Sequence, residues 1–137
     1  MSNKRINDKI EYARERINDL EAWLSEGEIK EKKAFFASEK AFQELTESLM
    51  DIFAMILSDL RMVVKDDYTN IDKLKEKNIL GEDHAGIAIE ANGLRNRIVH
   101  RYNSVDEKIF VESAKELLPK LTSLLQHLEN YNMRENE

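Results

Sequence analysis

The segment from Arg95 to Tyr102 gathers side chains that could cleave a phosphodiester bond. It reads Arg-Asn-Arg-Ile-Val-His-Arg-Tyr, in a chain whose formal net charge is −6 at pH 7. Histidine titrates near neutral pH and can move a proton, whereas arginine stays charged and can hold two phosphate oxygens at once. Arg95 and His100 could therefore promote attack of a ribose 2′-hydroxyl on the neighbouring phosphorus of RNA, with no need for a metal ion.

Helix geometry sets a condition on this reaction. Each residue of an ideal α-helix turns by about 100°, so Arg95 and His100 point roughly 140° apart around the axis. Asn96 and His100 share a face, so Asn96 could orient the imidazole. Either the helix is distorted near its end, or a second copy of the chain supplies the missing group. We favour a symmetric dimer, which would line one cleft with two copies of the pair.

The residues around this pair point to a local RNA contact. Arg97 and Arg101 share a helical face and could guide RNA, although they suit a solvent-exposed surface equally well. The net negative charge speaks against a broad nucleic-acid-binding face, so contact must be local or shared with a partner chain. The chain has no cysteine, and its carboxylates show no ligand spacing, so we expect neither a metal nor another cofactor.

The positions of apolar residues predict how the segment is held in place. Apolar side chains recur at steps of three and four, the pattern of amphipathic helices. The predicted helices cover residues 4–25, residues 33–65, a short stretch capped by Thr69 and Asn70 and closed by Gly81, a stretch from about Asp83 towards Tyr102, and a last one that follows a capping box at Ser104 and is kinked at Pro119. We therefore predict an all-α fold, an antiparallel four-helix bundle with a short accessory helix.

Length and composition set the wider limits. The 137 residues suffice for one domain, which we assign to residues 1–131, followed by a polar tail at 132–137 that we expect to be disordered. Charged residues make up 35% and aromatic residues 7%, with one proline, a mixture that favours helices. No apolar stretch is long enough to suggest a signal peptide or membrane span, so we expect a cytoplasmic protein without a membrane partner.

The motif resembles the signature of the HEPN superfamily. That signature is an arginine, four residues of which the first is commonly polar, a histidine, one further residue and a tyrosine. The matching residues here are Arg95, Asn96, His100 and Tyr102. The family's acidic position before an apolar stretch is similar to Asp51. The resemblance covers roughly residues 33–130 and is to the toxins of HEPN–minimal nucleotidyltransferase toxin–antitoxin systems.

This resemblance implies a fold, an activity and a regulator. Members are helical bundles that form homodimers and place the arginine and histidine in a cleft between subunits. Many are metal-independent endoribonucleases that cut tRNA or mRNA. We therefore expect an RNA substrate and no DNA partner. The partner antitoxin is a minimal nucleotidyltransferase that can transfer AMP to the motif tyrosine, here Tyr102. A negatively charged adenylyl group beside Arg95 would block the phosphate site by charge and by bulk.

Two other interpretations stay open at this point. A helical module without catalytic activity could use the motif to bind a nucleotide or a nucleotidyltransferase partner. A structural adaptor would carry Arg95 and His100 on an ordinary solvated helix face, with Tyr102 at the edge of the core. Of the remaining histidines, His84 is expected at the local surface, and His127 either at the surface or with its hydrogen bonds satisfied within the protein. Neither is expected to take part in the chemistry.

Overall fold

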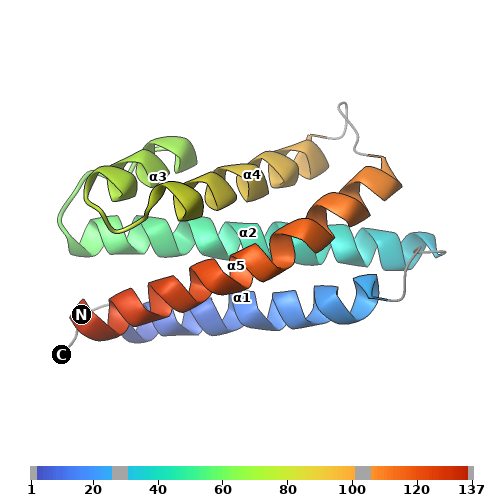
Figure 1. Cartoon of the computed structure of the whole chain (residues 1–137), viewed down its shortest axis with the longest axis horizontal. Helices are drawn as coiled ribbons and strands as arrows, with labels where there is room; N and C mark the ends of the chain where they lie inside the picture. The colour runs from blue at the N-terminus through green and yellow to red at the C-terminus, as the bar shows by residue number, and fades with distance from the viewer. Residues whose placement is uncertain (1–2, 26–30, 101–105, 136–137) are drawn as a thin grey trace.

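The computed structural model describes residues 3–25, 31–100 and 106–135 of the chain. Within these ranges there is no strand, and the helices are α1 (Asn3–Leu24), α2 (Lys32–Asp59), α3 (Asp67–Glu76), α4 (Glu82–Val99) and α5 (Glu107–Glu135). Figure 1 shows α1, α2, α4 and α5 running lengthwise, with the short α3 beside the start of α4. The prediction of an all-α bundle with a short accessory helix is confirmed.

Helix α2 lies at the centre of the bundle and packs against α1, α3 and α4. The α1 stripe expected from the sequence is buried throughout, from Ile6 to Leu24. Near the starts of α2 and α5, the ring of Phe110 meets those of Phe35 and Phe42 edge-on, with centroids 5.7 and 6.0 Å apart. These aromatic contacts connect α5 with α2.

Two helix boundaries differ from the prediction where the chain leaves α2. The apolar pattern suggested a helix to residue 65, but α2 ends at Asp59 and Arg61 has a φ of 59°. That left-handed conformation turns the chain, so Val63 is 66% exposed and does not extend the core stripe. Asp66, one turn before the predicted cap, accepts a hydrogen bond from the backbone N–H of Thr69 and caps α3.

The later boundaries differ as well. Asn78, with a φ of 59°, lies just past the end of α3. Gly81 is the N-cap residue of α4 and does not close α3, contrary to the prediction. α4 itself stops at Val99, short of the expected extension towards residue 102. Asp106 caps α5, because its Oδ1 accepts a hydrogen bond from the backbone N–H of Lys108 at 2.8 Å. The predicted cap, residue 104, lies outside the described residues.

The last helix extends past the predicted domain boundary. We expected a polar tail from residue 132, whereas α5 passes through Pro119 and continues to Glu135. Asn132 is 4% exposed, and its amide donates a hydrogen bond to Asn7 on α1 at 3.0 Å. A polar residue can thus extend a helix when a neighbouring helix supplies its partner.

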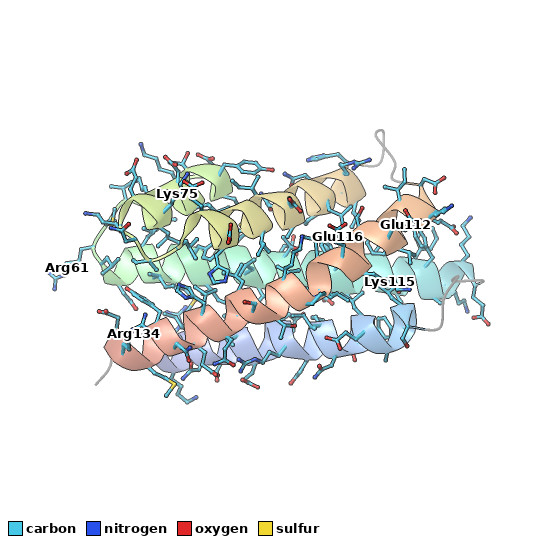
Figure 2. The ribbon with its side chains drawn as sticks, viewed as in Figure 1. Arg61, Lys75, Glu112, Lys115, Glu116 and Arg134 are labelled. Carbon is cyan, nitrogen blue, oxygen red and sulfur yellow. The ribbon has the colours of Figure 1, made fainter. Side chains whose placement is uncertain are left out.

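The outer faces of the bundle are charged. Figure 2 shows Glu112, Lys115 and Glu116 projecting from α5, and Arg134 near its end. In the described ranges, no helix has both the length and the apolar character needed to cross a lipid bilayer.

Candidate active site around Arg95

Arg95 is held from two sides at the junction of α2 and α4. Its Nη2 donates a hydrogen bond to Oε2 of Glu47 on α2 at 2.6 Å, and its Nη1 donates to Oδ1 of Asn96 at 2.9 Å. The Arg95 side chain is 24% exposed and that of Glu47 41% exposed. The guanidinium therefore reaches solvent while an ion pair between helices fixes its position.

Glu47 keeps its negative charge beside this arginine. Burial alone raises the pKa of the Glu47 carboxyl, but hydrogen bonds from Arg95 and Gln43 and the charges of Arg95 and Lys40 outweigh that effect. The net result is a pKa below the ordinary value of 4.5. At neutral pH, Glu47 thus compensates part of the positive charge that Arg95 could offer to a phosphate.

The guanidinium is not fully used by these two contacts. Its Nε is buried and has no hydrogen-bond partner among the described residues, and the same holds for Oδ1 of Asn92, three residues earlier on α4. An unsatisfied buried polar group costs about 1–3 kcal/mol. The Nε of Arg16 on α1 is a further group of this kind, so the feature is not confined to the surroundings of Arg95.

Asn96 connects Arg95 to a third helix. The Asn96 amide Nδ2 donates a hydrogen bond to the hydroxyl of Tyr68, in the first turn of α3, at 3.4 Å. Its side chain thus contacts Arg95 and Tyr68, and its backbone carbonyl accepts the His100 N–H at 2.9 Å. Among these contacts, the Asn96 side chain orients the arginine.

Sequence reasoning missed two members of this group, Glu47 and Tyr68. They lie 48 and 28 positions from their partners on α4, so no local spacing links them. The one available signal was that Glu47 precedes Asp51 by four residues and thus lies one turn away on the same helix. A carboxylate was expected on this part of α2, and the structure shows which one meets the arginine.

His100 follows the last residue of α4, and its backbone angles are no longer those of an α-helix. Its backbone angles are φ −96° and ψ 79°, and its side chain is exposed. The backbone N–H of His100 still donates to the carbonyl of Asn96, and the ψ of 79° redirects only the chain that follows His100. The ending of α4 therefore does not by itself bring His100 to the face of Arg95. Arg101 and Tyr102 lie outside the described residues.

The other predicted site residues lie apart from Arg95. Asp51 forms an ion pair with Lys9 on α1, with Nζ and Oδ2 2.9 Å apart. Arg97 faces α5, where it lines a groove of about 320 Å³ together with Glu90 and Glu116. Two carboxylates beside Arg97 make that groove a poor path for a phosphate backbone.

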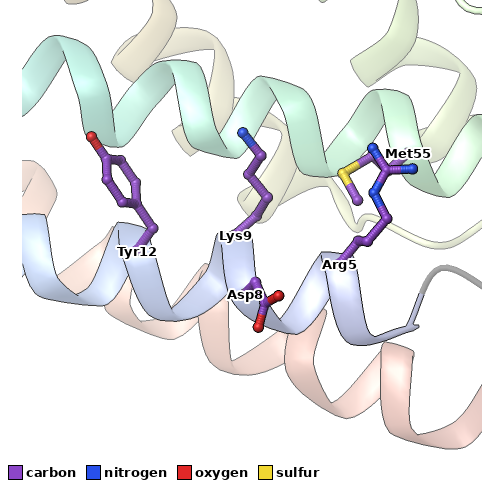
Figure 3. Close-up of a pocket in the computed structure, with 5 residues that line it drawn as sticks. All are labelled: Arg5, Asp8, Lys9, Tyr12 and Met55. Carbon is purple, nitrogen blue, oxygen red and sulfur yellow. The ribbon is translucent and has the colours of Figure 1, made fainter.

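A second hollow, on α1, is separate from this group. It has a volume of about 380 Å³ and is lined by Arg5, Asp8, Lys9, Tyr12 and Met55. Figure 3 shows three of these side chains extending from α1 towards α2, while Asp8 points the other way. One of its two cations, Lys9, is already paired with Asp51 of α2, and no hydrogen bond among the described residues links this hollow to Arg95.

The two remaining histidines contact each other, and the ring contact and hydrogen bond that they form do not include Arg95 or Asn96. The rings of His84 on α4 and His127 on α5 have centroids 4.7 Å apart, and Nε2 of His127 lies 2.6 Å from the carbonyl oxygen of Ile79. Both side chains are half-buried, and the contact between them was not predicted. His127, whose ring nitrogen is hydrogen-bonded, fits the alternative of a satisfied histidine. Their contact serves packing between α4 and α5.

Comparison with known proteins identifies the family of this site. Residues 6–128 match the family model described as Ribonuclease HepT-like. The chain belongs to the HepT-like ribonuclease family. The match runs from α1 into α5, which confirms the HEPN resemblance and extends it to α1.

Three relatives of this HepT-like chain carry the words "Putative RNase" in their names. Two are from Archaeoglobus fulgidus: one is 36% identical over 132 residues, 95% of each chain, and the other 36% identical over 106 residues, 77% of each. The third, from Methanocaldococcus jannaschii, is 38% identical over 80 residues, 58% of this chain and 87% of that protein. An RNase-type function is therefore supported both by the family and by a similarly named relative that matches 95% of the chain.

Proposed function

We propose that this HepT-like chain is a metal-independent endoribonuclease in which Arg95 binds the scissile phosphate and His100 transfers a proton. The observation that carries the proposal is the placement of Arg95. Its guanidinium is fixed by Glu47 and Asn96 and reaches solvent, five residues before an exposed histidine at the helix end. These are the two groups that cleavage by a 2′-hydroxyl requires.

The reaction proceeds by transesterification. A histidine removes the proton of the 2′-hydroxyl, whose oxygen bonds to phosphorus, and the bond from phosphorus to the 5′-oxygen breaks. A second acid protonates the departing 5′-oxygen, which leaves a 2′,3′-cyclic phosphate and a free 5′-hydroxyl. Arg95 offsets the negative charge that builds on the phosphoryl oxygens. In a homodimer, Arg95 of one copy and His100 of the other act on the same phosphate.

The proposal extends to regulation and substrate. The chain acts as the toxin of a HEPN–minimal nucleotidyltransferase pair, cuts tRNA or mRNA, and is neutralised when the antitoxin adenylylates Tyr102. The family and the position of Tyr102, two residues after His100, support this extension. An added phosphodiester near Arg95 would compete with RNA for the same guanidinium.

The direct test is RNA cleavage in the presence of a chelator. Wild-type protein should produce 2′,3′-cyclic phosphate ends, and Arg95→Ala and His100→Ala should each reduce the rate by at least about 100-fold. Arg134→Ala, which removes an exposed arginine at the end of α5, is the matched control and should cut normally. Cleavage that survives in both site variants would contradict the assignment. A wild-type protein that cuts no RNA but binds its nucleotidyltransferase tightly would instead be the non-catalytic module.

Mixed dimers test whether the cleft is shared. Arg95→Ala and His100→Ala chains are unfolded together and allowed to re-associate. If each reaction uses Arg95 of one chain and His100 of the other, mixed dimers contain one complete site, and activity should recover to about a quarter of the wild-type value. No recovery would mean that both residues of a site come from the same chain or that two intact pairs are needed. A monomer in size-exclusion chromatography would contradict the dimer.

A further inference from the structure

Tyr68 is an aromatic residue beside the motif that the proposed reaction does not use. It lies in the first turn of α3, and its hydroxyl accepts the hydrogen bond from Asn96. The side chain remains 44% exposed, although it touches the residue next to Arg95. The chain thus presents an accessible aromatic ring close to the expected phosphate position.

The first turn of α3 is held rigidly in place. The Asn70 side chain both accepts from the backbone N–H of Lys65 at 2.8 Å and donates to its carbonyl at 3.0 Å. Asp66 accepts from the N–H and the hydroxyl of Thr69, at 3.2 and 2.6 Å. These four bonds surround Tyr68 in the sequence and fix the backbone from which its ring projects. A ring on such a backbone loses little conformational freedom when it binds a ligand.

Packing does not explain the ring. The buried residues of α3 are Asn70, Ile71 and Leu74, which attach the helix to the bundle without Tyr68. The hydrogen bond to Asn96 is long, at 3.4 Å, and therefore weak. Neither the stability of α3 nor the position of Asn96 depends strongly on the phenol.

We propose that Tyr68 stacks against a nucleobase next to the cleaved phosphate, and so makes this site prefer a single-stranded RNA segment. The inference rests on the proposed ribonuclease function and names its substrate class. Bases in loops and single strands are unstacked and bind aromatic side chains by stacking, whereas the bases of a duplex are not available for it. Tyr68 and Arg95, joined through Asn96, would hold the base and the phosphate of one stretch of RNA.

The test uses two substitutions of Tyr68 and one matched control. Tyr68→Leu removes the ring, and Tyr68→Phe keeps it but removes the hydroxyl. Tyr12→Leu is the control: Tyr12 is 38% exposed, lies on α1 in the separate hollow, and has the guanidinium of Arg16 5.1 Å from its ring centroid. Binding is measured by fluorescence anisotropy with a single-stranded RNA that carries 2′-O-methyl groups and cannot be cleaved.

Loss of the ring should weaken binding in a recognisable way. Tyr68→Leu should raise the Kd about tenfold at every salt concentration, because stacking releases no counterions, whereas Arg95→Ala should also flatten the salt dependence. In cleavage assays, Tyr68→Leu should raise KM with little change in kcat, since the base is bound equally in substrate and transition state. Tyr68→Phe and Tyr12→Leu should stay within about twofold of wild type. The Kd for double-stranded RNA should be the same for wild type and both Tyr68 variants.

An abasic RNA series identifies the stacked base. Where the RNA lacks that one base, wild type should bind about as weakly as Tyr68→Leu, and the substitution should have no further effect. If Tyr68→Leu binds and cuts like wild type, or if Tyr68→Phe fails as badly as Tyr68→Leu, the stacking proposal is overturned while the ribonuclease assignment stands. If the variants differ in binding but wild type never cleaves, Tyr68 stacks as proposed and the catalytic assignment fails. If wild type binds no RNA, both are overturned.

Discussion

Replacement of Glu47 by glutamine separates two roles that the structure gives to this carboxylate. Glu47→Gln keeps the shape of the side chain and an oxygen that can accept from Arg95, but it removes the negative charge 2.6 Å from the guanidinium. The carboxylate positions Arg95 and also competes with RNA for it. The substitution should therefore affect turnover and RNA affinity in opposite directions.

The structure indicates the size of each effect. An uncompensated Arg95 should attract a phosphate by about 1 kcal/mol more, which lowers the Kd for RNA about fivefold. A less firmly positioned guanidinium should lower kcat about tenfold, because small misplacements of a catalytic group are costly. Since the pair is 24% and 41% exposed, its loss should reduce the free energy of unfolding by only about 1 kcal/mol.

The assays are single-turnover cleavage, binding of uncleavable RNA and urea unfolding. Glu44→Gln is the matched control, because Glu44 lies on the same helix, has 33% side-chain exposure, and is 3.9 Å from Arg16 on α1. It should leave kcat and the Kd unchanged. Weaker RNA binding by Glu47→Gln, or an unchanged kcat, would refute the view that this carboxylate holds Arg95 and limits its charge.

The pH dependence of stability provides an independent check of the same ion pair. The pKa of Glu47 is lowered from its ordinary value of 4.5, so the folded protein binds this proton less readily than the unfolded chain. The stabilisation by Glu47 is therefore full above about pH 4.5 and is lost as the pH falls through the folded value. The difference in unfolding free energy between wild type and Glu47→Gln should shrink as the pH drops from 5 towards 3.

Three further predictions concern residues around the site and between the helices. Asp51→Asn should lower the cleavage rate far less than Glu47→Gln, because Asp51 pairs with Lys9; an equal loss of kcat would restore the supporting role that the sequence suggested for Asp51. Arg14→Lys should lower the free energy of unfolding by about 1 kcal/mol in urea titrations, because lysine cannot form the paired bonds that Arg14 makes to both oxygens of Glu129, at 2.8 and 3.3 Å. Burial first, and then the charge of His127, lower the pKa of His84 from 6.5. The free energy of unfolding, measured in urea, should therefore decline as the pH falls below about 6.5, and His84→Gln should lessen that decline.

Much of this protein could be predicted from local patterns. The buried stripe of α1 from Ile6 to Leu24 follows directly from helical periodicity, because each apolar step of three or four residues must face the same side. The predicted helix boundaries were wrong where a single residue decides where a helix ends or begins. Neither the left-handed turn at Arg61 nor the cap supplied by Asp66 alters the apolar pattern. The helix ranges predicted from periodicity therefore placed the end of α2 too late and the cap of α3 too late.

The candidate site divides in the same way. Spacing alone selected Arg95, Asn96 and His100, because they lie within six consecutive residues and their chemistry is evident from residue type. The resemblance to the family also suggested a carboxylate on α2 but pointed to Asp51. The choice between two acids one turn apart depends on how α2 is rotated against α1 and α4. Rotation and register arise from the packing of whole helix faces, to which no single residue spacing is sensitive.

The sequence by itself determined the five helical segments, the family motif and the chemistry available to it, since these depend on residues close together in the chain. Only the tertiary structure decided that Glu47 fixes and partly neutralises Arg95, that Tyr68 stands beside Asn96, and that Arg97 faces the opposite groove. Such contacts join residues dozens of positions apart, and they exist only because the packed core sets one rotation and one register for each helix.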